Sequence, residues 1–303
     1  MEIMAGRNRA VIQVMKTQKE AMMAYKDVLV HLDYSEACIA RVAAAIALAK
    51  REGARLTGVA MALETTVSTY IGIDFPTSLT EAQQEIIEKS TKNAVARFEA
   101  AVKAEGVDYA VRVIRCPAGK AASQLAFFAR HADLIFIGQP DPDSTGHAFQ
   151  ESLLDMVLHS SGRPVYVVPY IGRLEHRASR AVIAWDGRKK AVRAVNDAIP
   201  MLKVRDKVDV LVVNPKKRDD DFGGQQGENL ADHLKRHGVN AEVVRITHPE
   251  IGVDTVILNY VSDVGADLLV MGAFGHSRLR EKTFGGVTVS ILQQMTVPVL
   301  MSE

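Results

Sequence analysis

Glycine is concentrated in one segment near the C-terminus that could bind phosphate. The segment runs from Gly272 to Thr288 and reads Gly-Ala-Phe-Gly-His-Ser-Arg-Leu-Arg-Glu-Lys-Thr-Phe-Gly-Gly-Val-Thr, and a helix is expected near its end. Glycines let the backbone approach phosphate oxygens closely, and the free N–H groups of a helix N-terminus favour negative charge. A turn that needs glycine only for its backbone angles is the alternative. Four glycines before a helix favour the phosphate-binding loop.

Asp186 is a second candidate, because it follows an apolar run that begins near Ser179. In an open parallel sheet, ligands bind at the carboxyl ends of the strands where the winding reverses direction. With the strand order 3-2-1-4-5, that point lies between strands one and four, so Asp186 and Gly272 would face each other. Capping of the following helix is the alternative role for Asp186. Its place in the crevice favours ligand binding.

The chain contains an internal repeat. Apolar runs ending in Asp occupy residues 26–33 and 179–186, and residues 132–138 match residues 266–272. Gly138 to Pro164 spans 26 residues, and so does Gly272 to Pro298. The distance from the Asp to the Gly is 105 residues in the first half and 86 in the second, a difference of 19. We expect the extra residues mostly around 64–88.

Both halves predict the same α/β fold. The apolar runs are rich in Val, Ile and Leu without alternation, as in strands buried on both faces of a parallel sheet. Helical patterns cover residues 36–51, 81–104, 121–130 and 152–159 in the first half, and 189–202, 228–237, 253–264 and 287–295 in the second. Each half is therefore expected to be a doubly wound domain with a five-stranded parallel sheet flanked by helices. We expect an N-terminal extension at 1–24 and domains at 25–171 and 179–303.

Composition limits the classes of partner. The chain of 303 residues has 37 Lys and Arg against 36 Asp and Glu, so it lacks the basic field that holds nucleic acid or an anionic membrane. No run of apolar residues is long enough to cross a bilayer. The two cysteines are too few for a disulfide framework and favour a reducing cytoplasm. We expect a cytoplasmic protein whose anionic ligand is small.

The second half resembles the ATP-binding branch of the universal stress protein (UspA-like) family. The resemblance rests on Gly-x2-Gly-x9-Gly followed by a small residue, after Ala-Asp-Leu-Leu-Val-Met-Gly and before a final Val-Pro-Val-Leu strand. It covers nearly everything from residue 26 onward and implies a tandem-domain protein with ATP, with or without Mg²⁺, in the second domain; AMP and ADP are alternatives. The implied nucleotide contacts are Asp186 at the adenosine end, the backbone of Val213 and Asn214 at adenine, and Met271, Gly272, Gly275, Gly285, Gly286, Val287 and Thr288 around ribose and phosphates.

One position departs from that family pattern. The family usually has Ser or Thr where this chain has Gly286, so the main-chain N–H is kept and a hydroxyl contact is lost. Thr288 is the candidate to replace that hydroxyl. Arg278, Arg280 and Lys282 would add positive potential near the phosphates, although charged loop residues are more often solvated.

The first half keeps Gly138 but carries carboxylates in the rest of the same register. Asp141 matches Gly275, and Glu151 matches Gly285. Carboxylates at those positions would repel phosphate and remove the close approach of the backbone. We therefore predict that the first domain does not bind ATP in the family manner.

No catalytic constellation is visible in the sequence. His233 and His237 lie four residues apart, but two ligands without a third are a weak zinc signal. Cys116 could be reactive or simply buried. We predict a nucleotide-binding module with slow or no hydrolysis. The alternatives are a nucleotide-free scaffold or dimerisation protein, and an enzyme of the related nucleotide α-hydrolase type, which would need a substrate domain or metal site.

The last strand of each half is expected to form an edge of its sheet. The resemblance to the universal stress protein family also implies that the strands at 164–168 and 298–301 pair with one another, within a chain or between chains, since exposed sheet edges invite pairing. The result would be a compact two-domain unit that could dimerise further.

Overall fold

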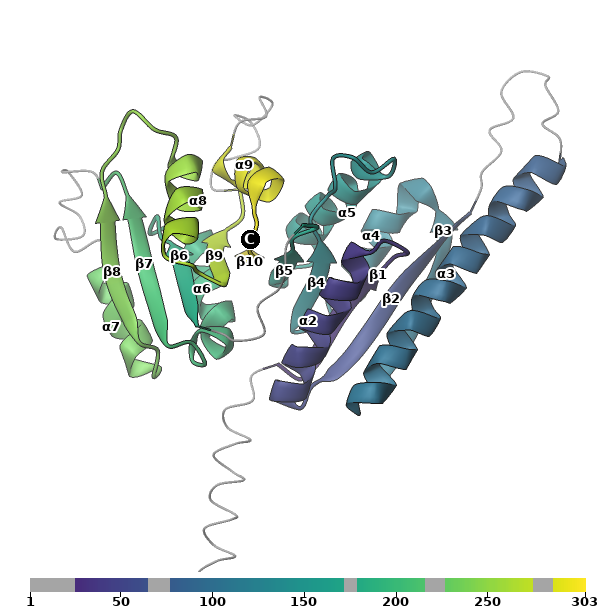
Figure 1. Ribbon diagram of the computed structural model, residues 1–303, viewed down its shortest axis with the longest axis horizontal. Coiled ribbons are helices and arrows are strands. Elements are labelled where there is room, and N and C mark those ends of the chain that lie inside the picture. The colour runs from purple at the N-terminus through teal and green to yellow at the C-terminus, as the bar shows by residue number, and fades with distance from the viewer. Residues whose placement is uncertain (1–24, 65–76, 172–178, 216–226, 275–285) are drawn as a thin grey trace, which may run out of the picture.

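The computed structural model describes residues 25–64, 77–171, 179–215, 227–274 and 286–303 (Figure 1). The expected extension at 1–24, the linker at 172–178, and Gly275 and Gly285 of the glycine-rich segment lie outside the described residues. So do Arg278, Arg280 and Lys282.

Strands and helices alternate along each half. The first half contains β1 (Asp27–Leu32), α2 (Ala37–Glu52), β2 (Arg55–Glu64), α3 (Thr77–Glu105), β3 (Tyr109–Pro117), α4 (Ala118–Ala129), β4 (Leu134–Gly138), α5 (His147–Ser160) and β5 (Val165–Val168). The second half contains β6 (Arg180–Ala184), α6 (Lys189–Leu202), β7 (Lys207–Val213), α7 (Glu228–Arg236), β8 (Ala241–Ile246), α8 (Val253–Asp263), β9 (Leu268–Gly272), α9 (Val287–Gln294) and β10 (Val299–Ser302).

The strands form a single ten-stranded sheet of order β3-β2-β1-β4-β5-β10-β9-β6-β7-β8. Each half therefore has the expected order 3-2-1-4-5, and its neighbouring strands are parallel. The two halves join where β5 and β10 pair antiparallel, with Leu300 opposite Tyr166. The expected pairing of the last strands is thus present within one chain, and the sheet runs through both halves (Figure 1).

Apolar packing covers both faces of the sheet. One core cluster joins the sheet to α2, α3, α6 and α7, and the other joins it to α4, α5, α8 and α9. Strand residues such as Val30, Leu134 and Val270 are completely buried. Their unbroken apolar runs reflect this two-sided burial, which only a parallel sheet with helices on both faces provides. Both clusters include residues of the two halves, so the core crosses the β5–β10 junction.

One helix differs most in length between the halves. Helix α3 has 29 residues, whereas its counterpart α7 has 9, and β2 has 10 residues against 7 in β7. The extra residues of the first half are therefore in the region where the sequence placed them.

Helix α5 begins earlier than predicted. It starts at His147, whereas the sequence analysis placed the start at Ser152. In the second half, glycines at 285 and 286 precede α9. The matching positions of the first half are Glu151 and Ser152, and Gln150 and Glu151 are good helix formers, so the helix extends back through them.

Candidate functional site

Asp186 and Gly272 line the same cavity in the second half. The parallel pairing of β6 with β9 places Ala184 opposite Met271, so the residues that follow these strands emerge side by side. A cavity of about 240 Å³ lies there, lined by Asp186, Arg188, Lys189, Lys190, Ala191 and Gly272. The crevice expected between strands one and four is therefore present, and it lies at the point where the winding of the sheet reverses.

Gly272 is required by the close packing of α6 against the end of β9. A Cβ atom at this position would lie 2.6 Å from the main-chain nitrogen of Ala191 and 2.7 Å from the carbonyl carbon of Lys190. Both are backbone atoms, which cannot move aside as a flexible side chain can. The absence of a side chain at 272 thus brings the N-terminus of α6 directly against the strand end.

Basic residues surround the N-terminus of α6. Lys189 is the first residue of this helix of 14 residues, and Arg188 and Lys190 flank it. The N-terminus of a helix carries partial positive charge, so three consecutive cations there are unfavourable unless an anion lies nearby. Asp186 offsets part of this charge, because its Oδ1 accepts a hydrogen bond of 2.9 Å from the Arg188 N–H. Lys190 donates from Nζ to the carbonyl oxygen of Phe274, at 2.7 Å, and to Glu303 Oε1, at 2.9 Å.

Val213 and Asn214 lie at the end of β7, the strand next to β6. Val213 pairs with Ile246, and the Asn214 N–H donates to the Ile246 carbonyl at 2.8 Å. The Asn214 side chain is also engaged, because Oδ1 accepts from the His248 N–H at 2.7 Å and Nδ2 donates to the His248 carbonyl at 3.2 Å. Asn214 has a positive φ of 49°, which Asn tolerates better than most residues. The side chain therefore fixes the turn, and the main chain is what this position could offer a ligand.

The described remainder of the glycine-rich segment has mainly structural contacts. Met271 is buried in the core, and Thr288 is buried with its Oγ1 accepting a hydrogen bond of 2.9 Å from the Phe274 N–H. Gly286 precedes Val287, the first residue of α9, in an extended conformation with φ −73° and ψ 148°. A Cβ atom at Gly286 would meet no described residue within 4 Å. A serine side chain would therefore fit at position 286, where this chain has glycine.

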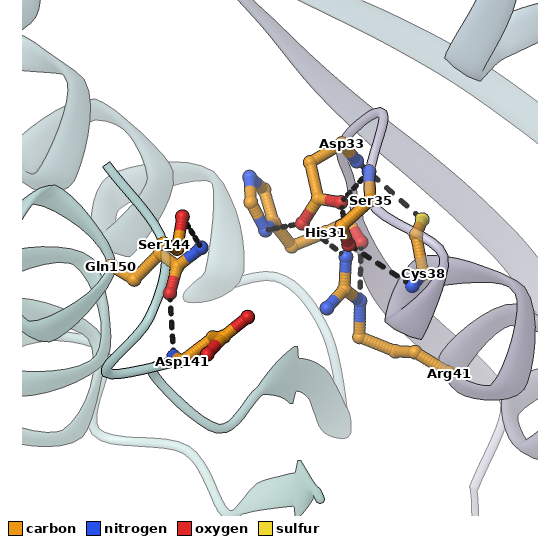
Figure 2. A network of polar contacts seen from close by, with 8 residues as sticks. All are labelled: His31, Asp33, Ser35, Cys38, Arg41, Asp141, Ser144 and Gln150. Carbon is orange, nitrogen blue, oxygen red and sulfur yellow. Dashed lines mark hydrogen bonds and ion pairs between the residues drawn. The ribbon is translucent and has the colours of Figure 1, made fainter. Parts of the chain in front are cut away.

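The matching crevice of the first half is filled by Arg41. Its side chain is only 3% exposed, and Nη2 lies 2.6 Å from Asp33 Oδ2 while Nε donates to the His31 carbonyl at 2.8 Å. A Cβ atom at Gly138 would lie 2.2 Å from Arg41 Nη1. The guanidinium thus occupies the space between the ends of β1 and β4 (Figure 2).

Asp33 is fully engaged by these neighbours. Its Oδ1 accepts a hydrogen bond of 2.8 Å from the Ser35 N–H and a further one from the Ser35 hydroxyl. Burial alone would raise the pKa of Asp33, but Arg41, His31 and Ser35 outweigh it and hold that pKa well below its usual range. Burial and the Arg41 charge also lower the pKa of His31 to about 4, so this imidazole is neutral at physiological pH.

Asp141 and Glu151, the two carboxylates singled out in the first half, have different surroundings. Asp141 lies in the loop after β4, where its Oδ1 accepts from the Asp143 N–H at 3.0 Å and its N–H donates to Gln150 Oε1 at 2.8 Å (Figure 2). Glu151 lies on the surface of α5 and pairs with His147 at 3.3 Å. Glu151 lies within α5 and not before its start, so it is not a structural counterpart of Gly285. The expectation that its carboxylate stands at a phosphate-binding helix start is therefore wrong.

Four residues of the two crevices were not singled out from the sequence: Arg188, Lys189 and Lys190 in the second half and Arg41 in the first. A signal was available for the three residues of the second half, because a basic run directly after Asp186-Gly187 opens a helix. In the gapless register the first half has Ser35, Glu36 and Ala37 at those positions, and Arg41 corresponds to Ala194. Aligning these turns would have revealed the difference in charge.

The remaining candidates acquire no ligand role. Cys116 is buried and unpaired, and burial raises the pKa of its thiol, so it has the properties of a structural cysteine. His233 and His237 have ring centroids 4.6 Å apart, but among the described residues no group of three or more His, Cys, Asp or Glu could hold a metal ion. None of the helices described is long and apolar enough to cross a membrane.

Sequence comparison identifies the family of both halves. The sequence profile of the universal stress protein family matches residues 24–169 and again residues 178–302. The chain belongs to the universal stress protein family. It is similar to universal stress protein Slr1230 of Synechocystis sp., with 38% identity over 68 residues, which is 22% of this chain and 22% of that protein. That match thus spans about a fifth of the relative's length.

Solved structures share the tandem fold. A universal stress protein from Archaeoglobus fulgidus aligns over 91% of this chain and 96% of its own, with 16% identity and a TM-score of 0.70. The functionally unknown protein PA1789 from Pseudomonas aeruginosa aligns over 93% of this chain and 94% of its own, with 14% identity and a TM-score of 0.52. At these identities the likeness concerns the fold of this universal stress protein.

Proposed function

We propose that the second domain, residues 179–303, binds one adenine nucleotide, ATP, in the crevice between β6 and β9, with slow or no hydrolysis. The observation that carries this proposal is the cavity lined by Asp186, Gly272 and three consecutive basic residues at the N-terminus of α6. The helix end and the cations favour a bound anion, and Gly272 brings them together. At about 240 Å³ the cavity is smaller than a typical ligand pocket of roughly 300–1,000 Å³, so it would hold only part of the nucleotide.

Each residue has a proposed role in this site. Asp186 would accept from the ribose hydroxyls, and the main chain at Val213 and Asn214 would contact adenine. The basic residues and the main chain of Gly272 and of the start of α9, with Met271, Gly286, Val287 and Thr288, would surround the ribose and phosphates. Gly275 and Gly285 belong to the same proposal. Among the described residues no group of three or more His, Cys, Asp or Glu could hold a metal ion, so any Mg²⁺ would be held largely by the phosphates of the nucleotide itself.

The first domain, residues 25–171, would bind no nucleotide in this manner. Arg41 fills the equivalent crevice and occupies the carboxylate of Asp33, which is the counterpart of Asp186. We therefore expect one nucleotide per chain. Both cysteines are unpaired, which supports the reducing cytoplasm as the proposed location.

Two measurements test the proposal. Nucleotide released by acid from the purified protein and identified by chromatography should be ATP or its products. Calorimetric titration of the nucleotide-free chain should then give one ATP per chain. Absence of both co-purified nucleotide and binding heat would favour the nucleotide-free scaffold, and two nucleotides per chain would contradict the proposed difference between the domains.

A charge reversal provides a more local test. Lys189→Glu gives the second domain the residue that the first domain has at this position, Glu36. Lys189 is exposed, so the fold should persist, and ATP affinity should fall by roughly tenfold or more because two unit charges change beside the phosphates. The matched control is Glu36→Lys, which should leave the stoichiometry at one. Unchanged affinity in Lys189→Glu would show that the phosphates bind elsewhere.

A further inference from the structure

A polar cluster joins the first domain to the crevice of the second. The carboxylate of Glu303, the residue after β10, bridges two cations: Oε1 accepts from Lys190 Nζ at 2.9 Å, and Oε2 contacts His159 Nδ1. Lys190 lines the cavity of the second domain, whereas His159 lies in the last turn of α5 in the first domain. The two domains therefore share one carboxylate directly beside the proposed phosphate site.

His159 also packs on the strand end that forms the crevice. Its ring stacks on Phe274, with centroids 4.4 Å apart and an interplanar angle of 27°. Phe274 has a positive φ of 50°, accepts from Lys190 through its carbonyl and donates through its N–H to Thr288. The His159 side chain is 11% exposed, so the contact is largely sheltered from water.

The charges around His159 come from three elements. Asp155 of α5 lies 3.3 Å from Nε2 and is mostly exposed, Glu303 contacts Nδ1, and Lys190 of α6 lies on the other side of Glu303. The hydrogen bond to Asp155, opposed by burial and reinforced by Glu303, raises the pKa of His159 above its usual range.

Protonation of His159 decides how much of the Lys190 charge a phosphate can use. When His159 is charged, the Glu303 carboxylate is shared between two cations, and Lys190 keeps positive charge for an anion in the cavity. When His159 is neutral, Glu303 is balanced by Lys190 alone, and its negative charge opposes a phosphate there. This competition is Coulombic and acts at short range in a partly buried site.

We propose that His159 of the first domain is a positioning residue for the nucleotide site of the second, drawing the Glu303 carboxylate away from Lys190 so that Lys190 can bind phosphate. The inference rests on the proposed ATP site and adds to it a dependence on the other domain. It also gives the site a pH response: ATP affinity should fall as the pH rises through the pKa of His159.

Variants with opposite expected signs test this role. His159→Phe keeps a ring against Phe274 but removes the proton, and it should weaken ATP binding by roughly fivefold or more at pH 7. Glu303→Gln removes the competing charge at the end of the chain and should strengthen ATP binding, and it should restore affinity in the double variant. A merely structural role would weaken binding in both. Asp155→Asn removes the main cause of the raised pKa of His159, so it should weaken ATP binding in the same direction as His159→Phe but by a smaller factor, since the ring remains able to bind a proton.

The pH profile and a measurement without nucleotide complete the test. Calorimetry between about pH 6 and about pH 8.5, the range in which a histidine of raised pKa titrates, should show affinity falling with pH in the wild-type chain. Any decrease in ATP affinity with pH that exceeds the decrease in the His159→Phe variant is due to titration of His159. NMR titration of the His159 ring in the nucleotide-free chain should show a raised pKa that decreases in Glu303→Gln.

The outcomes separate the two proposals. If the wild-type chain binds no ATP, the proposed function fails and this inference fails with it. If ATP binds but His159→Phe and Glu303→Gln change affinity in the same direction, or not at all, only the inference is overturned. Circular dichroism and thermal unfolding of each variant show whether the fold is intact, and the C-terminal Glu303→Gln variant keeps the test open if His159→Phe does not fold.

Discussion

The crevices of the two domains are formed by the same strands and filled in different ways. In the first domain, Arg41 reaches from the second turn of its helix to Asp33 and lies against Gly138. In the second domain the residue matching Arg41 is Ala194, the helix backbone itself approaches Gly272, and basic residues stand at the helix start. One crevice thus contains a buried cation paired with its own carboxylate, whereas the other has a cavity lined by less buried cations, of which Arg188 and Lys190 also pair with Asp186 and Glu303. A repeat can therefore keep its fold while only one copy keeps the electrostatics of an anion site.

The largest expected effect comes from the glycines that face the two helices. Gly272→Ala places a Cβ against backbone atoms of α6, so we expect a loss of about 3 kcal/mol in the free energy of unfolding together with the loss of ATP binding. The matched change Gly138→Ala meets only the end of the Arg41 side chain, which can shift, and should cost less. Denaturant unfolding of both variants measures the difference. Equal losses of stability would contradict the inference that the α6 backbone lies closer to Gly272 than the α2 backbone lies to Gly138.

The acid dependence of stability should come from the first domain. His31 is buried with a pKa of about 4, whereas its unfolded value is about 6.5, so the unfolded chain binds the extra proton first. Stability should therefore decrease as the pH falls from about 6.5 towards 4, by on the order of 3 kcal/mol.

The matched variant for this dependence is His31→Gln, which should flatten the slope over the same range. The second domain has Ala184 at the corresponding position and should contribute nothing of this kind. The depressed pKa of Asp33 acts separately, because its stabilisation is present above about pH 4 and is lost only at lower pH. A pH slope that persists in His31→Gln would place its origin elsewhere.

Removal of the cation from the first crevice should destabilise that domain. Arg41→Ala leaves Asp33 without its main partner, and we expect a loss of roughly 2 kcal/mol, below the range for fully buried pairs because Asp33 is 27% exposed. The double variant Asp33→Ala/Arg41→Ala should lose less than the sum of the single changes, as a double-mutant cycle would show. The number of ATP molecules bound per chain should stay at one. A second bound nucleotide would mean that Arg41 alone had closed the first site.

The smallest expected effect is a gain. Gly286→Ser adds the hydroxyl that the family usually has, at a helix start where a Cβ meets no described residue. Serine is a slightly better N-terminal cap than glycine, so stability should rise by a few tenths of a kcal/mol, about 1 °C in Tm. ATP affinity should rise two- to threefold, the effect of about half a kcal/mol from one additional hydrogen bond. A decrease in both quantities would show that the start of α9 is not near the phosphates.

The strand order, and with it the position of the crevice, was implied by the family resemblance, whereas the sequence by itself determined the repeat and its buried parallel strands. These follow from local features: apolar runs such as the one ending at Asp186 identify buried parallel strands, and the equal spacing from Gly138 and Gly272 to the final strands fixes the register. Aligning the two halves also places Glu36 opposite Lys189. This difference can be seen in the sequence alone because a charge at a helix start acts locally. The start of α5 was placed at Ser152, five residues too late, because the helical pattern was recognised only from that residue onward.

Only the tertiary structure decided what fills each crevice and that the last strands, whose pairing the sequence analysis expects, meet within one chain. Arg41 could reach Asp33 or solvent from the same helix position, and the packing of α2 against the sheet selected Asp33. The pairing of β5 with β10 made one sheet of two, and it brought His159, Lys190 and Glu303 together from distant parts of the chain. Contacts of that kind depend on the directions of side chains and on the junction between domains, which residue types and spacing do not encode.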